Sequence, residues 1–168
     1  MFQLHKKSFK IVDFSVVLKS TIFLVILLII YIFKFTTIVG VSMEPTFYNG
    51  QKGISIMDRF GLLSFKRSDI VLIEKHSYNP NKVLIKRVIG CPGDNVCIRD
   101  NSIYINGELI VEDYIKEVMS SPNMSVELVE NEYFVLGDNR NNSIDSRLPN
   151  IGIIKDNEII GKLLFTIN

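Results

Sequence analysis

Residues 102–110 read SIYINGELI, and they point to the fold class of the chain. Apolar and polar side chains alternate over residues 102–105, which is the period of a strand with one buried face. Asn106 and Gly107 follow, and this pair is favoured in two-residue hairpin turns because both positions need a positive φ. Residues 108–110 resume the apolar pattern. The stretch therefore predicts an antiparallel β-hairpin.

Short runs with the same alternation, or rich in β-branched residues, recur between turn signals in the rest of the chain. We predict further strands at residues 70–74, 82–89, 96–99, 125–129, 133–136 and 161–167. No long segment with the 3.6-residue period of an amphipathic helix competes with them. Residues 36–168 are therefore expected to form one mainly β domain of antiparallel sheets, either a sandwich or a partly open barrel.

A long apolar segment precedes this β domain. Residues 14–33 read FSVVLKSTIFLVILLIIYIF, in which Lys19 is the only charged residue. About 20 such residues form an α-helix long enough to cross a hydrocarbon core of roughly 30 Å. A secretory signal would instead have an apolar region of about 7 to 15 residues before a cleavage site. A buried helix of a soluble core is seldom apolar on every side. We predict one transmembrane helix at residues 14–35.

The charges that flank this segment predict its orientation. Residues 5–10 hold three lysines and one histidine, whereas Lys34 stands nearly alone after the span. The positive-inside rule then places residues 1–13 in the cytoplasm and residues 36–168 outside the cell membrane. Across the whole chain, 19 Lys and Arg residues balance 18 Asp and Glu residues. This balance predicts no nucleic-acid partner.

Two cysteines, Cys91 and Cys97, lie six residues apart around Pro92 and Gly93. On an outward-facing domain a short-loop disulfide between them is sterically possible. Cys97 also occupies a position in an alternating run, where a free thiol packs as a small apolar side chain. We favour two buried free thiols over the disulfide.

Ser42 lies in the stretch GVSMEPT of residues 40–46, soon after the apolar segment. Gly40 permits unusual backbone angles, and Pro45 biases the residue before it toward an extended conformation. A constrained turn of this kind can present the Ser42 hydroxyl and the Ser42 N–H to a substrate. A serine in a turn is more often only a hydrogen-bonding turn residue. Ser42 therefore needs a base nearby to be a nucleophile.

A nucleophilic serine usually relies on a histidine, and histidine is scarce in this chain. His5 is expected on the other side of the membrane, and His76 lies in a polar loop. Lys86 shares one face of its predicted strand with Leu84 and Val88. Apolar burial there would lower its pKa from about 10.4 toward the working pH. The alternative is an edge-strand lysine that blocks aggregation.

A third polar stretch, GDNRNNSIDSR, occupies residues 137–147 after the predicted strand YFVL. Its closely spaced Asp, Arg and Ser side chains can satisfy one another's charges and hydrogen bonds. A merely solvated surface loop would not need this arrangement.

The chain resembles bacterial type I signal peptidases, in a compact form like that of Gram-positive relatives. The resemblance rests on four stretches in the family's order, SMEPT at 42–46, DIV at 69–71, KRVIG at 86–90 with PGD at 92–94, and residues 137–147. Cys91 stands where the family usually has a leucine. It implies a β-rich serine endopeptidase that cleaves signal peptides of exported preproteins at a lipid bilayer, near the secretion translocon. It implies no metal and no cofactor.

The same resemblance assigns roles to individual residues. Ser42 would be the nucleophile and Lys86 the general base of a Ser-Lys dyad. Supporting roles are implied for Ser143, as a hydrogen-bond partner of the lysine amine, for an Asp145–Arg147 ion pair, and for Asp138 and Arg140. Some members have a serine where this chain has Gly40, so the oxyanion is expected to rely on backbone donors such as the Ser42 N–H. Candidate linings of the substrate pockets are Ile38, Met43, Leu84 and Ile85.

Two other functions fit parts of this pattern. A self-cleaving repressor-type Ser-Lys protease has a similar catalytic domain, but the sequence contains no visible DNA-binding module or internal scissile site. A membrane-anchored β domain that binds a surface partner without catalysis is the second alternative. Reaction of Ser42 with an acylating inhibitor would separate an enzyme from such a binding domain.

Overall fold

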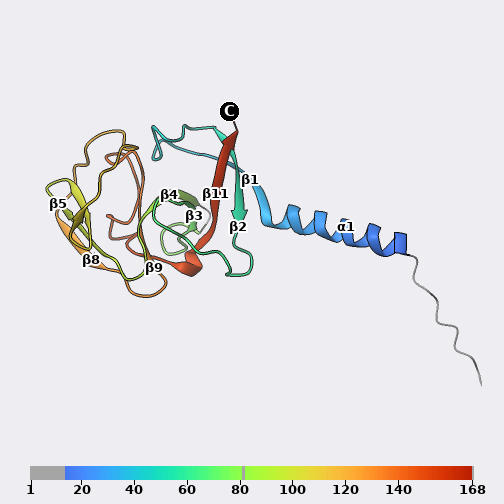
Figure 1. The fold of residues 1–168 in the computed structure, drawn as a ribbon. Coiled ribbons are helices and arrows are strands. Elements are labelled where there is room, and N and C mark those ends of the chain that lie inside the picture. Colours follow the sequence, from blue (N-terminus) through green and yellow to red (C-terminus); the bar gives the residue numbers. More distant parts are fainter. Residues whose placement is uncertain (1–13, 81, 168) are drawn as a thin grey trace, which may run out of the picture. The chain divides into compact units, whose positions relative to one another are not determined.

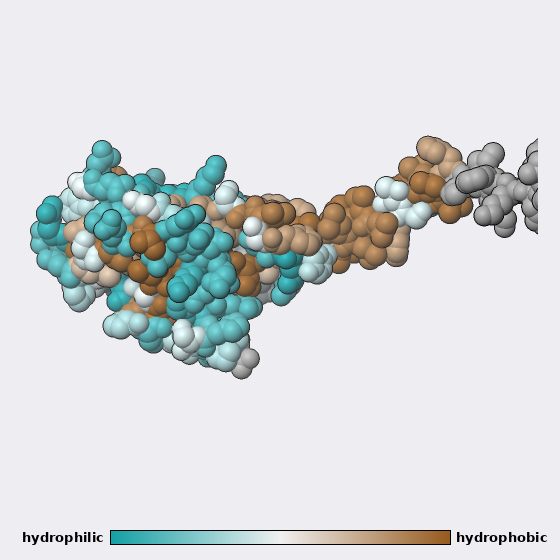
Figure 2. Space-filling view, turned by 90° about the horizontal axis from the view of Figure 1, so that it is seen from below, coloured by the Kyte–Doolittle hydropathy of each residue, from teal (hydrophilic) through white to brown (hydrophobic). Residues whose placement is uncertain are grey.

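The computed structural model describes residues 14–80 and 82–167. The chain separates into two compact units, with the boundary between Ile32 and Phe33. The first unit contains helix α1 (Phe14–Ile32), which has no buried side chain. Its surface is apolar along almost its whole length (Figure 2). In the part of the chain that is described, α1 is the one helix long and apolar enough to cross a membrane.

Helix α1 is shorter than the predicted anchor of residues 14–35. It ends at Ile32, and strand β1 (Phe33–Thr37) begins at the next residue. β1 pairs antiparallel with β2 (Lys52–Met57), so the backbone of residues 33–35 bonds to a neighbouring strand instead of continuing the helix. The sequence pattern missed β1 because it follows α1 directly, without a turn signal between them. Residues 1–13, which the charge pattern assigns to the cytoplasm, lie outside the described residues.

The second unit is mainly β and contains two antiparallel sheets, as the alternating pattern predicts (Figure 1). The larger sheet has seven strands, in the order β1, β2, β11 (Ile159–Ile167), β3 (Ile70–Glu74), β4 (Val83–Gly90), β9 (Glu132–Leu136) and β10 (Ile154–Lys155). The smaller sheet has four, in the order β7 (Glu108–Leu109), β6 (Ser102–Ile105), β5 (Asn95–Arg99) and β8 (Met124–Glu127). A single 3₁₀ turn, Asp156–Glu158, leads into β11.

The hairpin expected at residues 102–110 is present. β6 pairs with β7, and Asn106 and Gly107 both have a positive φ, at 52° and 86°. These angles are the ones that a type I′ turn requires, which explains why this residue pair occurs between the two strands.

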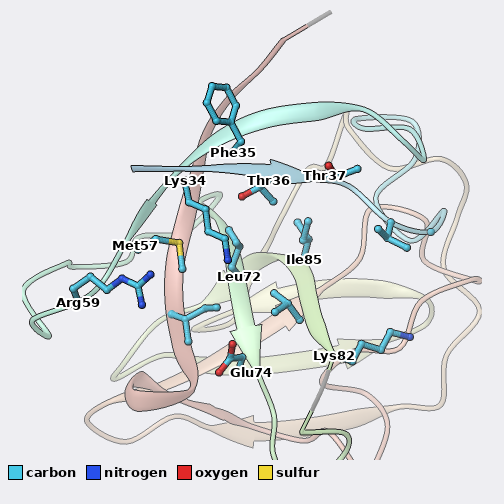
Figure 3. Close-up of a pocket in the computed structure, with 14 residues that line it drawn as sticks. Lys34, Phe35, Thr36, Thr37, Met57, Arg59, Leu72, Glu74, Lys82 and Ile85 are labelled. Atoms are coloured by element: carbon cyan, nitrogen blue, oxygen red, sulfur yellow. The ribbon is translucent and has the colours of Figure 1, made fainter. Parts of the chain in front are cut away.

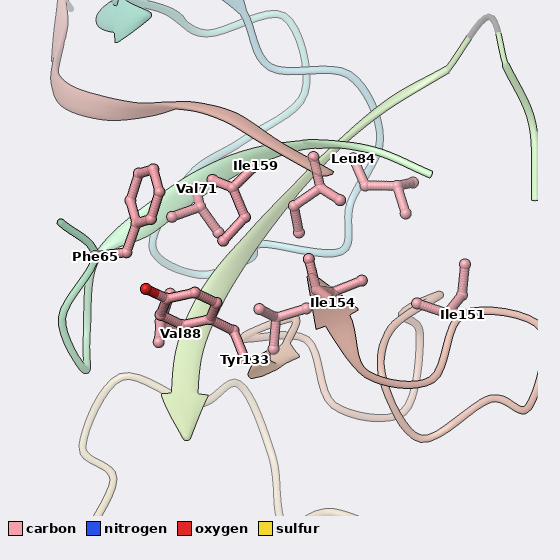
Figure 4. Packing of buried hydrophobic residues seen from close by; sticks show 10 residues of the cluster. Phe65, Val71, Leu84, Val88, Tyr133, Ile151, Ile154 and Ile159 are labelled. Atoms are coloured by element: carbon pink, nitrogen blue, oxygen red, sulfur yellow. The ribbon is translucent and has the colours of Figure 1, made fainter. Parts of the chain in front are cut away.

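Strand β4 contributes to the cores of both sheets because its side chains alternate between two faces. Leu84 and Val88 belong to a core cluster on one face (Figure 4), whereas Ile89 belongs to the cluster that the smaller sheet covers. The first cluster contains Phe65, Val71, Ile73, Leu84, Val88, Tyr133, Val135, Ile151, Ile154 and Ile159. β4 is therefore held rigidly, and any polar group on it is fixed in place.

Cys91 and Cys97 are free thiols, as favoured over a disulfide. Both are only half-buried. Cys91 packs against the first core cluster, and burial raises the pKa of its thiol.

Candidate active site

The structure brings Ser42 and Lys86 together, although 43 residues lie between them in the sequence. Ser42 lies in the turn between β1 and β2, and Lys86 lies in the middle of β4. Lys86 Nζ is 2.7 Å from Ser42 Oγ, a hydrogen-bonding distance, and it donates to the Ile85 carbonyl oxygen at 2.9 Å. Nucleophile and base need this proximity for proton transfer.

Lys86 is nearly dry, since only 3% of the residue is exposed. Burial lowers the pKa of its amine from 10.5 to about 8. The negative charges of Asp145 and Asp138 oppose this shift, whereas the positive charge of Lys82 adds to it. A base with a pKa near 8 is partly neutral at neutral pH, as a proton acceptor must be.

The residue after the base, Arg87, has a different set of partners. Its Nε and Nη2 atoms donate to the two carboxylate oxygens of Asp138 at 2.8 and 2.6 Å. Its guanidinium also lies 3.9 Å from the centre of the Tyr114 ring. Thr46 donates its hydroxyl proton to the same Asp138 carboxylate, so one acidic side chain joins the nucleophile loop to the base strand.

The loop of residues 137–147 contains the predicted Asp145–Arg147 ion pair, with Arg147 Nη2 2.8 Å from Asp145 Oδ2. Asp145 also accepts a hydrogen bond from the Gly137 N–H at 3.1 Å. Asp138 and Arg140 were predicted to support this pair. Arg140 does so through its carbonyl, which accepts a hydrogen bond from Arg147, while its side chain pairs with Glu112. Asp138 instead pairs with Arg87.

Ser143 does not hydrogen-bond Lys86, contrary to the prediction. Its hydroxyl oxygen is buried and has no hydrogen-bond partner among the described residues. It lies so close to Gly137 that a Cβ atom there would be 2.2 Å from Ser143 Oγ and 2.5 Å from the Ser42 carbonyl oxygen. Position 137 therefore has no room for a side chain, and its glycine allows the polar loop to approach the nucleophile.

The Ser42 N–H has no hydrogen-bond acceptor within residues 14–80 and 82–167, so it is available to a substrate oxygen. Gly40 has a φ of +92°, a conformation that L side chains rarely adopt, and donates its N–H to Asn49 Oδ1 at 2.8 Å. A hydroxyl-bearing residue at position 40 would be strained in this backbone. These observations support the expectation that an oxyanion here relies on backbone donors.

Two cavities adjoin the dyad and share a wall formed by residues 39–40, Lys82, Val83 and Ile85. The first, of about 440 Å³, is lined by Ser42, Lys86 and residues 141–144. The second, of about 580 Å³, extends between β1, β3 and β4 and carries charged groups at its edge (Figure 3).

The predicted pocket linings occupy different places. Ile85 lines both cavities and Leu84 lines the one at the dyad. Ile38 and Met43 are instead packed in an apolar core cluster, each with 2% of its surface exposed. They line neither cavity, because their side chains fill the space beneath the nucleophile loop. Within the described residues, no group of three His, Cys, Asp or Glu side chains is placed to hold a metal ion.

A mainly antiparallel β domain with a serine hydroxyl against a buried lysine amine has the arrangement of a Ser-Lys peptidase. Comparison with known proteins agrees: a family profile described as "Signal peptidase, peptidase S26" matches residues 11–167. The chain belongs to this family. It is therefore a serine peptidase of the signal peptidase I type.

Individual relatives give the same result. The chain is 34% identical to a signal peptidase I of Bacillus licheniformis, over 84% of this chain and 80% of the relative. It is 32% identical to signal peptidase I U of Bacillus subtilis strain 168, over 90% of this chain and 83% of the relative. A crystal structure of a signal peptidase I from Enterococcus faecalis V583 matches with a TM-score of 0.52 and 32% identity, covering 61% of this chain and 98% of that one.

Several residues of this region were not predicted from the sequence. Val39 and Val83 form part of the wall between the two cavities, and they could have been inferred as neighbours of Gly40 and Leu84. Glu112 and Tyr114 contact the arginines of the site from a segment without any recognisable pattern. No local signal in the sequence could have identified these two.

Proposed function

We propose that this chain is a membrane-anchored serine endopeptidase that removes signal peptides from exported preproteins through Ser42 and Lys86. The observation that carries the proposal is the 2.7 Å approach of a buried lysine amine to the hydroxyl of Ser42. Family membership and the match of its relatives over most of their length support the reaction and the substrate class.

The geometry suggests how each group takes part. Neutral Lys86 accepts the hydroxyl proton of Ser42, and the serine oxygen attacks the carbonyl carbon before the scissile bond. The Ser42 N–H donates a hydrogen bond to the oxyanion that forms. The lysine ammonium then protonates the leaving amine, and the acyl group stays on Ser42. A water molecule, deprotonated by Lys86, hydrolyses this ester and restores the enzyme.

The cavities favour an extended substrate chain. Residues 39–41 and 82–85 line the cavity at the dyad, and backbone groups at such edges can pair with a peptide strand, as in other cases of strand addition. The cavity at the dyad then receives a side chain next to the scissile bond, and the adjoining one receives a side chain further along. Ile85 contributes to both, so its size is expected to influence which residues are accepted.

The helix and the charges support a location in the cell membrane. α1 serves as a single anchor, with the N-terminus in the cytoplasm and the β domain outside. In this arrangement the active site meets a preprotein as it emerges, in proximity to the translocon and to the bilayer. Reaction of a membrane-impermeant thiol reagent with a cysteine introduced at an exposed position of the β domain in intact cells tests this orientation.

Replacement of each member of the dyad tests the proposed chemistry. We expect Ser42→Ala and Lys86→Ala each to lower preprotein cleavage by at least about 10²-fold, the usual contribution of a positioned base. Ser120→Ala and Lys66→Ala, which change exposed residues of the same types, serve as matched controls and should cleave normally. Normal cleavage by either dyad variant refutes the assignment. Cleavage of the chain itself instead of a preprotein would favour the repressor-type alternative.

A further inference from the structure

A segment without helix or strand connects β7 to β8 and crosses from the smaller sheet to the active site. Its two ends are fixed in the apolar cluster of the smaller sheet. Ile110 packs against that cluster, and Met119, with 2% of its surface exposed, is part of it. We call residues 112–118 between these anchors the strap. Its polar side chains contact each of the three stretches from which the candidate site is built.

Two strap residues contact the buried arginines of the site. Glu112 accepts hydrogen bonds from Arg140 Nη1 and Nη2 at 2.6 and 2.7 Å, and its carboxylate also accepts one from the Tyr114 hydroxyl. The Tyr114 ring lies under the Arg87 guanidinium, with 3.9 Å between the ring centre and the central carbon. Arg140 is only 2% exposed, and Glu112 is the carboxylate with which it forms an ion pair.

The strap also reaches the nucleophile loop. Lys116 Nζ lies 2.7 Å from Glu44 Oε2, two residues beyond Ser42, and the Lys116 N–H donates to the Asp138 carbonyl oxygen at 3.2 Å. The Val118 carbonyl oxygen accepts a hydrogen bond from Asn141 at 3.0 Å. One short segment therefore joins the loop that bears the serine, the strand that bears the lysine and the polar loop.

We propose that the strap positions the dyad, with Glu112 and Tyr114 as its main positioning residues. Arg87 directly follows the base in β4, and Asp138, which Arg87 holds, bonds to Thr46 of the nucleophile loop. Loss of Glu112 leaves a buried arginine charge without its carboxylate, and such a charge must move or attract water. A displacement of about 1 Å at reacting atoms costs about 10²-fold in rate. This inference rests on the proposed function of Ser42 and Lys86.

Glu112→Gln in the full-length chain tests the proposal, with Asp113→Asn as its matched control. Both variants convert an acid to its amide, but Asp113 is exposed and next to Glu112. We expect kcat for preprotein cleavage to fall about 10²-fold in Glu112→Gln, with KM little changed, because the substrate cavities stay intact. Asp113→Asn should change kcat by less than about twofold, as an exposed charge does.

A second pair of variants separates positioning from general stability. Tyr114→Leu removes the ring under Arg87, whereas Tyr114→Phe keeps the ring and loses only the hydroxyl. We expect a large loss of kcat in the first and near-normal kcat in the second. All values are measured well below the unfolding midpoint of each variant and divided by the folded fraction, so that a purely structural effect leaves kcat per folded molecule unchanged.

The outcomes distinguish this inference from the proposed function. Normal kcat per folded molecule in Glu112→Gln and in Tyr114→Leu overturns the strap proposal, provided that Ser42→Ala is inactive. Full cleavage by Ser42→Ala overturns the proposed function itself, whatever the strap variants show. A rise in KM with unchanged kcat in Glu112→Gln would also contradict the proposal, because it would assign the strap to substrate binding.

Discussion

Lys86 and Arg87 are neighbours on β4 and almost equally buried, with 3% and 8% of their surfaces exposed, but their surroundings differ. Lys86 faces a serine hydroxyl and a backbone carbonyl and has no carboxylate within ion-pair distance among the described residues. Arg87 has the Asp138 carboxylate on one side and the Tyr114 ring on another. The two faces of one strand therefore hold two basic side chains, one without a counter-ion in contact and one paired with a carboxylate.

The difference shows that partners, and not burial alone, decide whether a buried cation keeps its charge. Without a counter-ion in contact, burial lowers the pKa of Lys86 to about 8, so that a fraction of the amine is neutral near neutral pH and can act as a base. With a bidentate carboxylate, the guanidinium of Arg87 stays charged and joins the base strand to the loops. The surroundings of Lys86 allow it to accept a proton, and the ion pair of Arg87 maintains the geometry of the site.

The largest expected effect comes from replacing each cation by methionine and measuring the free energy of unfolding. Arg87→Met leaves the fully buried Asp138 carboxylate unpaired, so we expect a loss of about 3 to 5 kcal/mol. Lys86→Met should instead stabilise the protein at pH 7. A pKa lowered from 10.5 to about 8 corresponds to a penalty of roughly 3 kcal/mol below pH 8, which the variant removes.

The pH dependence of the stability difference between the parent protein and Lys86→Met provides a check. Between pH 8 and pH 10.5 the unfolded chain binds more protons at Lys86 than the native state, so the stability of the parent protein rises with pH in this window. The extra stability of Lys86→Met over the parent protein should therefore decrease as the pH rises from 8 to 10.5. The comparison breaks down if both methionine variants are destabilised equally at pH 7. The double variant Arg87→Met with Asp138→Leu should recover part of the loss, since no unpaired charge remains.

A smaller effect is expected from Asp145→Asn on the pH profile of cleavage. Asp145 is the strongest influence that raises the pKa of Lys86 against the effect of burial. Its removal should lower that pKa below about 8, so the acid limb of kcat/KM moves to lower pH. The position of this limb does not depend on the amount of folded enzyme. Glu130→Gln, at an exposed position, is the control, and a limb that moves to higher pH would contradict the prediction.

The smallest expected effect is that of Lys82→Gln. The exposed Lys82 ammonium lowers the pKa of Lys86, but less than Asp145 raises it. Its loss should shift the acid limb of kcat/KM to slightly higher pH, opposite to the Asp145 variant, and added salt should weaken the difference. Lys66→Gln should leave the profile in place. A shift of equal size in both lysine variants would show an effect of net charge alone.

The sequence predicted those parts of the fold that have a local signal. The strands at residues 70–74 and 102–105 were placed correctly, because alternating side chains and turn residues delimit them. β2 was missed because two of its three buried positions are Gly53 and Ser55, which are not apolar, and β10 because it has only two residues. The first three residues of β1 were assigned to the helix because no turn signal marks the point where helix α1 ends and strand pairing begins.

The candidate site divides in the same way. The motifs identified Ser42 and Lys86, and the structure places them within hydrogen-bonding distance. The partner of Arg140 could not be inferred, because Glu112 lies 28 residues away in a segment without periodicity. The expected bond from Ser143 to the lysine amine is absent, and the amine contacts the Ile85 carbonyl and Ser42 instead. A side chain can have several possible hydrogen-bond partners nearby. Tertiary packing decides which of them it contacts, and no local sequence pattern indicates this packing.

The two half-buried thiols have a practical consequence for spectroscopy. The chain contains only Cys91 and Cys97, and the raised pKa of the Cys91 thiol leaves little of the reactive thiolate at neutral pH. A cysteine introduced at an exposed site such as Val129 should therefore be alkylated well before Cys91. A fluorophore or spin label attached there would report on the β domain of the working enzyme with little background from Cys91.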